Sequence, residues 1–357
     1  MEENKQHKTA LPETEPIPSA QAPEALLDIR GLRVEYHTDE DVVYAVNGLD
    51  LTIGKGESLG LVGETGAGKT TTALSVLRLI ADPPGKIMGG EIWFEGEDML
   101  QAKPARLREI RGSKISVIFQ DPMTSLNPVY SVGDQIAEVI HQHEKCSKEE
   151  GRRKAGDMLE MVGIPRARYD EYPHQFSGGM KQRVVIAMSI ACSPELILAD
   201  EPTTALDVTI QAQVLELMNE LKEKLRTSLL LITHDLGVVA QVCDRVAIMY
   251  AGEIVESGTI AEVFDHPHHP YTIGLFGSIP SLDETAEKLK PIQGQMPDPT
   301  ELPEGCAFAP RCPYATGACR TRKPEMTGVG GTQMVRCLAH QGVFGSPELM
   351  EEVRHGR

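Results

Sequence analysis

The sequence contains no apolar run of the about 18 residues that a membrane-spanning helix needs. Residues 1–24 also lack the apolar core of a secretory signal peptide. They are polar and contain several prolines, which predicts a disordered tail. We therefore expect any role at a membrane to be peripheral and to depend on a partner protein.

Positive charge is also in short supply. Lys and Arg number 35 against 52 Asp and Glu, which gives a formal net charge of −17. Because nucleic acids are bound mainly through basic surfaces, this balance argues against nucleic acid as a main partner. The hydrophobic content of 41% is ordinary for a globular protein, and 357 residues suffice for one large domain with an addition, or for two domains.

Cysteine is sparse along most of the chain. Three of the seven cysteines are scattered, and the other four cluster near the C-terminus at Cys306, Cys312, Cys319 and Cys337. Because no export signal is present, we expect a reducing cytosol and reduced thiols.

A glycine-rich segment, G-E-T-G-A-G-K-T-T, is the most informative part of the sequence. It follows an apolar strand-like run at residues 57–62 and precedes a helical pattern at residues 72–80. The pattern G-x-x-x-x-G-K-T between a strand and a helix is typical of a phosphate-binding loop, the Walker A motif. Lys69 would reach the β- and γ-phosphates of a nucleotide, and the Thr70 hydroxyl would ligate Mg²⁺. The predicted binding residues are Gly63, Glu64, Thr65, Gly66, Ala67, Gly68, Lys69, Thr70 and Thr71.

Two adjacent carboxylates, Asp200 and Glu201, end another apolar strand. Side chains at the carboxyl ends of parallel strands share one edge of the sheet, so we expect both near the phosphate-binding loop. Asp200 then suits Mg²⁺, directly or through water, and Glu201 suits polarising a water for attack on the γ-phosphate.

Strand-like and helical segments alternate over most of the chain, which predicts a largely parallel sheet with helices on both sides. A β-rich entry at residues 26–51 comes first, and residues 131–162 form a helical insertion in which Ser131 and Ser147 are candidate N-caps. An amphipathic helix is predicted at residues 208–225, and a buried strand at 228–233. From about Phe264 the chain turns Pro-rich and loop-rich, which predicts a small appendage.

Taken together, these motifs resemble the nucleotide-binding subunit of an ATP-binding cassette (ABC) transporter. Gln120 matches the glutamine loop, Asp200 and Glu201 the Walker B end, and His234 the switch histidine. The resemblance covers roughly residues 26–340. The remaining matches are the signature Ser177, Gly178 and Gly179, the D-loop Ala205, Leu206 and Asp207, and Tyr36 as the aromatic that stacks on adenine.

The resemblance implies a P-loop NTPase fold of the α/β class. It consists of a mixed, mostly parallel sheet, an antiparallel β subdomain, a helical subdomain and a small C-terminal Cys-rich extension. We predict a tail at 1–24, an ATP-binding domain at 25–264 with its helical part at about 125–190, the extension at 265–345, and a tail at 346–357.

The family's mechanism is implied in the same way. Two such domains pair head to tail, and Ser177 and Gly179 of one contact the ATP bound to the other. Thr70, Gln120 and Asp200 would hold Mg²⁺. The catalytic residues would be Glu201, His234 and Gln120.

One branch of the family is the better match. The signature here reads F-S-G-G-M rather than the commoner L-S-G-G-Q, but this variant, the H-P-Y-T stretch at residues 269–272 and the Cys-rich tail resemble oligopeptide/dipeptide importers. The implied partners are a second, distinct ATP-binding subunit, two transmembrane permease subunits and, indirectly, a substrate-binding protein. The implied location is the cytoplasmic face of the inner membrane. There are three alternatives. The first is a transporter of the same kind with nickel or glutathione as cargo, the second is a soluble ABC protein acting on nucleic acid or ribosomes, and the third is a redox-sensing module.

The C-terminal cysteines have the spacing C-x5-C-x6-C-x17-C. Four thiolates match the ligand count of a [4Fe–4S] cluster, which some peptide-importer ATPases of this kind carry. Zn²⁺ is the alternative, although its usual sites use closer cysteine pairs. Disulfides or four unpaired cysteines are further possibilities. No metal site is predicted at the neighbouring histidines, His266, His268 and His269.

Overall fold

The computed structural model describes residues 25–204, 206–278 and 292–342. Its strands are β1 (Ala25–His37), β2 (Val42–Gly54), β3 (Ser58–Val62), β4 (Gly85–Phe94), β5 (Glu97–Asp98), β6 (Ile115–Ile118), β7 (Leu196–Asp200), β8 (Ser228–Thr233), β9 (Arg245–Tyr250), β10 (Glu253–Thr259), β11 (Thr327–Gly330) and β12 (Gln333–Val335). The predicted tails at 1–24 and 346–357 and the D-loop residue Ala205 lie outside the described residues.

The described helices are α1 (Lys69–Val76), α2 (Pro104–Ile110), α3 (Pro122–Ser125), α4 (Val132–His143), α5 (Lys148–Met161), α6 (Gly178–Ile190), α7 (Val208–Leu225), α8 (Leu236–Val242), α9 (Ile260–Asp265), α10 (Pro270–Phe276) and α11 (Gly317–Thr321). Short 3-10 turns occur at η1 (Arg166–Arg168), η2 (Pro173–Gln175) and η3 (Leu338–Gln341).

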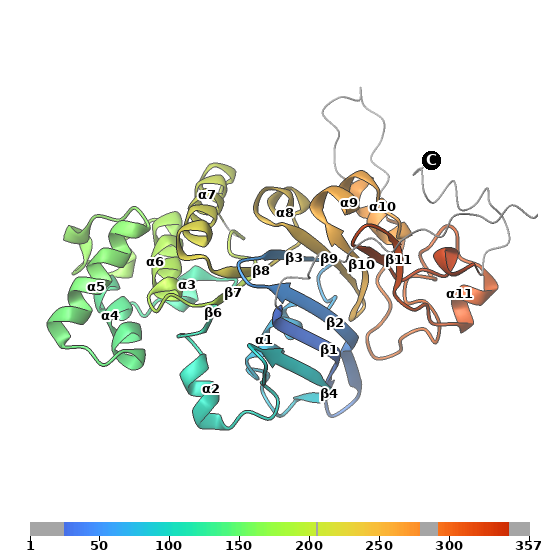
Figure 1. Cartoon of the computed structure of the whole chain (residues 1–357), viewed down its shortest axis with the longest axis horizontal. Coiled ribbons are helices and arrows are strands. Elements are labelled where there is room, and N and C mark those ends of the chain that lie inside the picture. Colours follow the sequence, from blue (N-terminus) through green and yellow to red (C-terminus); the bar gives the residue numbers. More distant parts are fainter. Residues whose placement is uncertain (1–24, 205, 279–291, 343–357) are drawn as a thin grey trace, which may run out of the picture.

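The central sheet has the order β11-β12-β10-β9-β3-β8-β7-β6. Its strands from β9 to β6 are parallel, whereas β10, β12 and β11 add on in antiparallel pairs. A separate antiparallel sheet, β2-β1-β4-β5, packs with α1 against one side, and α7 and α8 cover the other (Figure 1). The predicted parallel sheet with helices on both sides and the antiparallel β subdomain are therefore confirmed.

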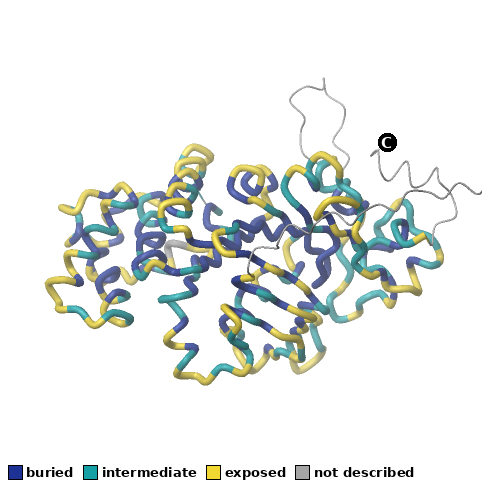
Figure 2. Tube along the Cα trace, in the orientation of Figure 1, coloured by how far each residue is buried: buried dark blue, intermediate teal, exposed yellow. Residues whose placement is uncertain are grey.

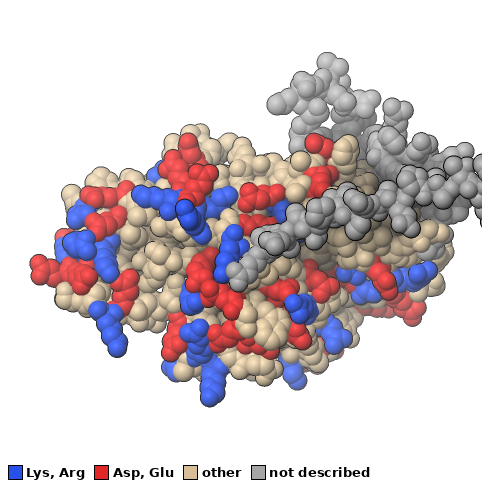
Figure 3. Space-filling view, in the orientation of Figure 1, with Lys and Arg blue, Asp and Glu red and all other residues tan. Residues whose placement is uncertain are grey.

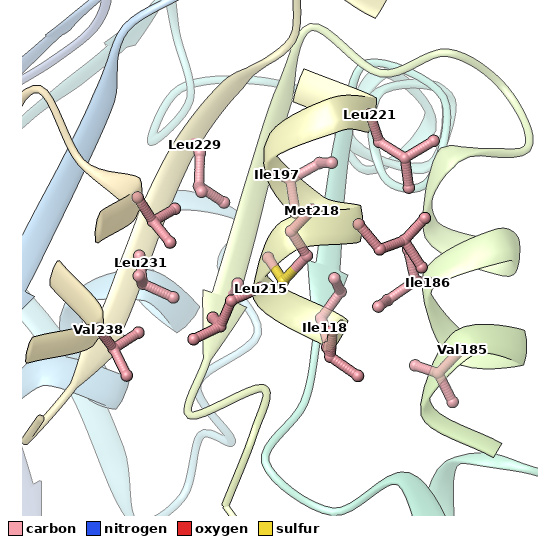
Figure 4. Packing of buried hydrophobic residues seen from close by; sticks show 14 of the residues in the cluster. Ile118, Val185, Ile186, Ile197, Leu215, Met218, Leu221, Leu229, Leu231 and Val238 are labelled. Carbon is pink, nitrogen blue, oxygen red and sulfur yellow. The ribbon is translucent and has the colours of Figure 1, made fainter. Parts of the chain in front are cut away.

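Alternation of side chains along β8 shows why residues 229–232 are all apolar. Leu229 and Leu231 belong to the core beneath α7 and α8, while Leu230 and Ile232 belong to the core beside α1 and the antiparallel sheet. Successive side chains of a strand point to opposite faces, so a strand covered on both faces needs apolar residues at every position. Figure 4 shows the first core between α6, α7 and the sheet, and Figure 2 shows that the most buried segments run through the centre of the molecule.

The helical region lies at one end of the molecule and the C-terminal segment at the other (Figure 1). Both predicted N-caps are confirmed, because Ser131 accepts a hydrogen bond from the Asp134 amide and Ser147 accepts one from the Glu150 amide. The predicted β-rich entry at residues 26–51 falls on β1 and β2.

The C-terminal segment contributes to the central sheet as well as to loops. In β12, Val335 pairs with Glu256 and Met334 pairs with Ser257 of β10, and β11 pairs with β12 in turn. The hairpin therefore extends the same sheet that carries the phosphate-binding loop.

Candidate active site

The phosphate-binding loop connects β3 to α1 and depends on glycine at defined positions. Gly66 and Gly68 have φ of +84° and +101°, the left-handed region that favours glycine. A Cβ on Gly68 would lie 2.2 Å from the Ala45 carbonyl oxygen, and one on Gly63 would lie 2.2 Å from the Met249 carbonyl oxygen. Glycine is therefore required both by the turn and by close contact with neighbouring strands.

Lys69 is the first residue of α1, and its side chain is buried under the loop. Its Nζ donates hydrogen bonds to the carbonyl oxygens of Gly63 (2.7 Å) and Glu64 (3.0 Å). Burial lowers the pKa of Lys69, while the carboxylates of Glu201, Asp200 and Glu64 act in the opposite direction. The ammonium group therefore lies among three carboxylates at the floor of the loop.

Two of the three predicted magnesium ligands, Thr70 and Asp200, are in direct contact although they are 130 positions apart. The Thr70 hydroxyl donates a 2.8 Å hydrogen bond to Asp200 Oδ2 at the end of β7. Burial raises the pKa of Asp200, and the hydrogen bond from Thr70 opposes that rise. A hydroxyl and a carboxylate beside a phosphate-binding loop are the oxygen donors that Mg²⁺ takes in P-loop proteins.

Glu201 follows β7 and is held by three side chains. Gln120 Nε2 donates to Glu201 Oε2 (2.8 Å), Thr204 Oγ1 donates to the same oxygen (3.0 Å), and His234 Nδ1 lies 3.0 Å from Oε1. Burial acts to raise the pKa of Glu201, but the hydrogen bonds with His234 and Thr204 outweigh it, and the pKa lies below its usual value. Glu201 also has φ of +45°, a conformation uncommon for a residue with a side chain.

All three predicted catalytic residues, Glu201, Gln120 and His234, are thus brought together. Thr204 was missed by the sequence reasoning, since a threonine three residues after a carboxylate carries no signal of its own. Tyr36, predicted to stack on adenine, is on β1, and its hydroxyl lies 3.2 Å from Thr71 Oγ1 at the start of α1.

The signature residues form a second group at the helical end. Ser177 caps α6 by accepting a hydrogen bond from the Met180 amide, and Asp207 caps α7 by accepting one from the Ile210 amide. A Cβ on Gly179 would lie 2.4 Å from Ile210 Cγ2, so the starts of α6 and α7 pack closely together, while Gly178 faces Leu206. The structure therefore joins the signature to the D-loop.

The four C-terminal cysteines line one small cavity together with His269 and Phe308. All four thiols are free. Over the described residues, however, no three His, Cys, Asp or Glu side chains are grouped closely enough to hold a metal ion. The predicted ligands Cys306, Cys312, Cys319 and Cys337 therefore line one cavity, but their side chains are not grouped closely enough to hold a metal ion.

Burial raises the pKa of both Cys312 and Cys337 to about 12, and it also raises the pKa of Cys306. Thiols must lose their protons to bind a metal ion, so this burial opposes metal binding.

Two further contacts at the loop come from the C-terminal half of the chain. The Glu64 amide donates to the Tyr271 hydroxyl (3.1 Å), and the Glu64 carboxylate accepts hydrogen bonds from Arg311 (3.0 and 3.1 Å). Tyr271 lies in the H-P-Y-T stretch that signalled the peptide-importer branch, whereas nothing in the sequence indicated Arg311. In the described part of the chain, no helix is both long enough and apolar enough to span a bilayer.

Comparisons with known proteins agree with this geometry. Residues 46–204 match the ABC transporter family, and residues 255–319 match the family described as oligopeptide/dipeptide transporter, C-terminal region. The chain is 49% identical over 318 residues to the oligopeptide transport ATP-binding protein AppD of Bacillus subtilis (strain 168), covering 88% of this chain and 97% of AppD. It is 51% identical over 314 residues to OppD of the same organism, also described as an oligopeptide transport ATP-binding protein, covering 87% of this chain and 88% of OppD.

A solved structure shares the fold. The dimeric structure of MJ0796, described as a bacterial ABC transporter cassette, superposes with a TM-score of 0.59 and 28% identity, covering 66% of this chain and 98% of that one. Together with the two matched families and the near-complete coverage of AppD, this shows that the chain belongs to the ABC transporter family, among ATP-binding proteins of the oligopeptide/dipeptide type.

Proposed function

We propose that this chain is the ATP-hydrolysing subunit of a membrane ABC importer of peptides. The observation that carries the proposal is Glu201, held by Gln120, Thr204 and His234 next to the Thr70–Asp200 pair. The cargo is supported by the oligopeptide relatives and by the matching C-terminal region. These matches do not favour nickel, glutathione or a role outside transport.

The residues divide the chemistry among them. Lys69 and the loop amides would bind the β- and γ-phosphates, and Thr70 and Asp200 would hold Mg²⁺, which when bound would neutralise charge on the phosphates. Glu201 is ionised at neutral pH because its pKa is lowered, so its carboxylate can polarise the attacking water. Gln120 and His234 orient that carboxylate through their contacts with Glu201.

The test is Glu201→Gln in the assembled transporter. Loss of the general base should lower turnover about 10²-fold or more, while ATP binding persists because the loop and Lys69 are unchanged. Glu195→Gln is the matched control, since Glu195 lies just before β7 and pairs with Lys114 away from the site. Near-normal hydrolysis by Glu201→Gln would refute the assignment, and unchanged uptake of labelled peptide by cells lacking the chain would refute the cargo.

We further propose that the active unit is a head-to-tail pair, with a distinct second ATP-binding subunit. Ser177 and the following glycines lie at the start of α6, where unpaired amides and the helix dipole favour an anion. They belong to the group at the helical end, so their target would be the ATP of the other subunit. Ser177→Ala should spare ATP binding by the isolated chain but depress turnover in the complex. Full turnover by the isolated chain, independent of its concentration, would contradict this.

The permease subunits would hold the chain at the cytoplasmic face of the membrane. A groove between the end of α1, β6, α4 and α6 supports this docking, and its wall includes Phe119 and Leu79, which are 49% and 37% exposed. Large exposed apolar side chains beside a groove mark a protein interaction site. The visible surface of the molecule mixes acidic and basic side chains (Figure 3), in contrast to the basic stripe of a nucleic-acid-binding face.

Phe119→Asp tests this docking. It should reduce co-purification with the permease subunits while ATP binding by the isolated chain is retained. Met88→Asp is the control, because Met88 is 43% exposed on β4 outside the groove. Equal loss of assembly in both variants would contradict the proposed groove.

For the C-terminal cavity we propose a [4Fe–4S] cluster, with Zn²⁺ as the alternative. Support comes from the donor set, since Cys306, Cys312, Cys319 and Cys337 all line the cavity. Binding would require these thiols to lose their protons and to approach one another. Anaerobic purification should yield a brown protein with absorbance at about 400 nm. A colourless protein with stoichiometric zinc would assign zinc, and a metal-free protein would refute a metal site.

A further inference from the structure

The C-terminal segment contacts the phosphate-binding loop through a buried arginine. Arg311 Nη1 lies 3.0 Å from Oε1 and 3.1 Å from Oε2 of Glu64, the second residue of the loop, 247 positions earlier in the chain. The Arg311 side chain is 6% exposed and that of Glu64 is 32% exposed. The pair is therefore better shielded from water than an ordinary surface ion pair.

Arg311 is fixed by its other contacts. Its Nε donates to the Gln293 carbonyl oxygen (3.1 Å) and its Nη1 to the Tyr250 hydroxyl (3.3 Å). Its guanidinium carbon lies 5.8 Å from the centre of the Tyr250 ring and 6.0 Å from that of Phe308. Because these contacts leave the guanidinium little freedom, it can hold Glu64 in one position.

Glu64 is unusual for its place in the molecule. It puts a carboxylate into a loop that binds the polyanionic phosphates of a nucleotide, and like charges repel across a partly buried site. Arg311 neutralises that carboxylate, and the Tyr271 hydroxyl holds the Glu64 amide from the other side. The loop is thus shaped by residues that lie after the ATP-binding core.

We propose that Arg311 is a positioning residue of the nucleotide site, through which the C-terminal segment sets the affinity for ATP. This inference rests on the proposed ATPase function. Arg311 acts through Glu64, by cancelling its charge and fixing the loop. If the Arg311–Glu64 pair only attached the C-terminal segment to the core, the single and double variants of these two residues would behave differently.

The experiment measures binding of MgATP to the full-length chain by calorimetry. Arg311→Ala should raise Kd about tenfold, the factor that 1.4 kcal/mol produces. Arg311→Lys, which keeps the charge but loses the Nε contact to the Gln293 carbonyl oxygen, should give a smaller rise. In the Glu64→Gln background, Arg311→Ala should change Kd less than about twofold, because no carboxylate remains to neutralise.

Arg336→Ala is the matched control. Arg336 belongs to the same C-terminal segment and anchors it to β10 through the Ile254 carbonyl oxygen (3.0 Å). It should leave the Kd for MgATP near that of the unmodified chain. In the assembled transporter, Arg311→Ala should raise KM for ATP far more than it lowers kcat.

Three results would overturn the inference. One is an unchanged Kd in Arg311→Ala. The second is a rise of equal size when Arg311→Ala is made in the unmodified chain and in the Glu64→Gln background. The third is an equal rise in Arg336→Ala, and either of the last two would mean that the Arg311–Glu64 pair only attaches the segment to the core. If the unmodified chain failed to bind MgATP, the proposed function itself would fail, and that outcome is distinct from all three.

Discussion

Thr204→Val removes one of the three hydrogen bonds that hold Glu201 without changing the size of the side chain. Thr204 Oγ1 donates to Glu201 Oε2 in a part-buried position, whereas the contacts from Gln120 and His234 are exposed and compete with water. The His234 side chain is 63% exposed and that of Glu201 only 15%. The threonine contact should therefore contribute most to the orientation of the carboxylate.

The magnitude follows from that geometry. A hydrogen bond to a charged group contributes about 1.5–3 kcal/mol, and each 1.4 kcal/mol corresponds to about a tenfold change in rate. Because two contacts remain to hold Glu201, we expect the lower end of this range, a fall in kcat of about tenfold. The Kd for MgATP should change little, since Thr204 contacts neither Lys69 nor the loop in the described geometry.

The pH dependence gives an independent readout. The hydrogen bond from Thr204 lowers the pKa of Glu201, so its removal should raise that pKa. A carboxylate that must be ionised loses activity as pH falls through its pKa, so the acidic limb of the pH–rate profile should move to higher pH. The assay is steady-state ATP hydrolysis by the assembled complex from pH 5 to 9, chosen as a range of about two units either side of neutrality.

Thr204→Ser keeps the hydroxyl and is the control. It should retain near-normal kcat and an unshifted profile. If the valine variant also matched the unmodified protein, or if the serine variant were equally impaired, the reasoning would be refuted, since the hydrogen bond would then not be the cause.

Three further predictions concern stability and the loop. Leu230→Ala should lower the free energy of unfolding by about 2–5 kcal/mol, because Leu230 is fully buried in β8. An unchanged midpoint of denaturant unfolding would contradict the packing of apolar cores on both faces of β8. Burial acts to raise the pKa of Glu262, but hydrogen bonds from Thr332 and from Thr259 at the start of α9 outweigh it and lower that pKa to about 2. The ionised carboxylate therefore stabilises the folded chain fully above the unfolded pKa of 4.5, and this stabilisation is lost as pH falls toward 2. Glu262→Gln should therefore lower thermal stability at pH 7 and matter less at pH 3, and a pH-independent effect would contradict this. Gly68→Ala should abolish MgATP binding, because the new Cβ meets the Ala45 carbonyl oxygen at 2.2 Å, and retained affinity would show that the loop can rearrange.

Local patterns in the sequence were enough to predict much of the framework. The spacing around Lys69 indicated a phosphate-binding loop, and the predicted helix at 208–225 and strand at 228–233 coincide with α7 and β8. These elements are recognisable because glycine placement and hydrophobic periodicity act within a few residues of each other. The proximity of Asp200 to the loop was also predictable, since parallel strands end at one sheet edge.

Other features were decided only by the tertiary structure. Thr204 and Arg311 acquire their roles from contacts with Glu201 and Glu64, and the Arg311 partner lies 247 positions away. The pairing of β12 with β10 likewise could not be predicted from the sequences of the two segments. The four cysteines line one cavity, but among the described residues they are not grouped closely enough to hold a metal ion, and their spacing in the sequence does not encode those distances. Sequence alone thus predicted the phosphate-binding loop, because its chemistry is local, whereas only the fold determined which distant side chains hold that loop and Glu201 in place.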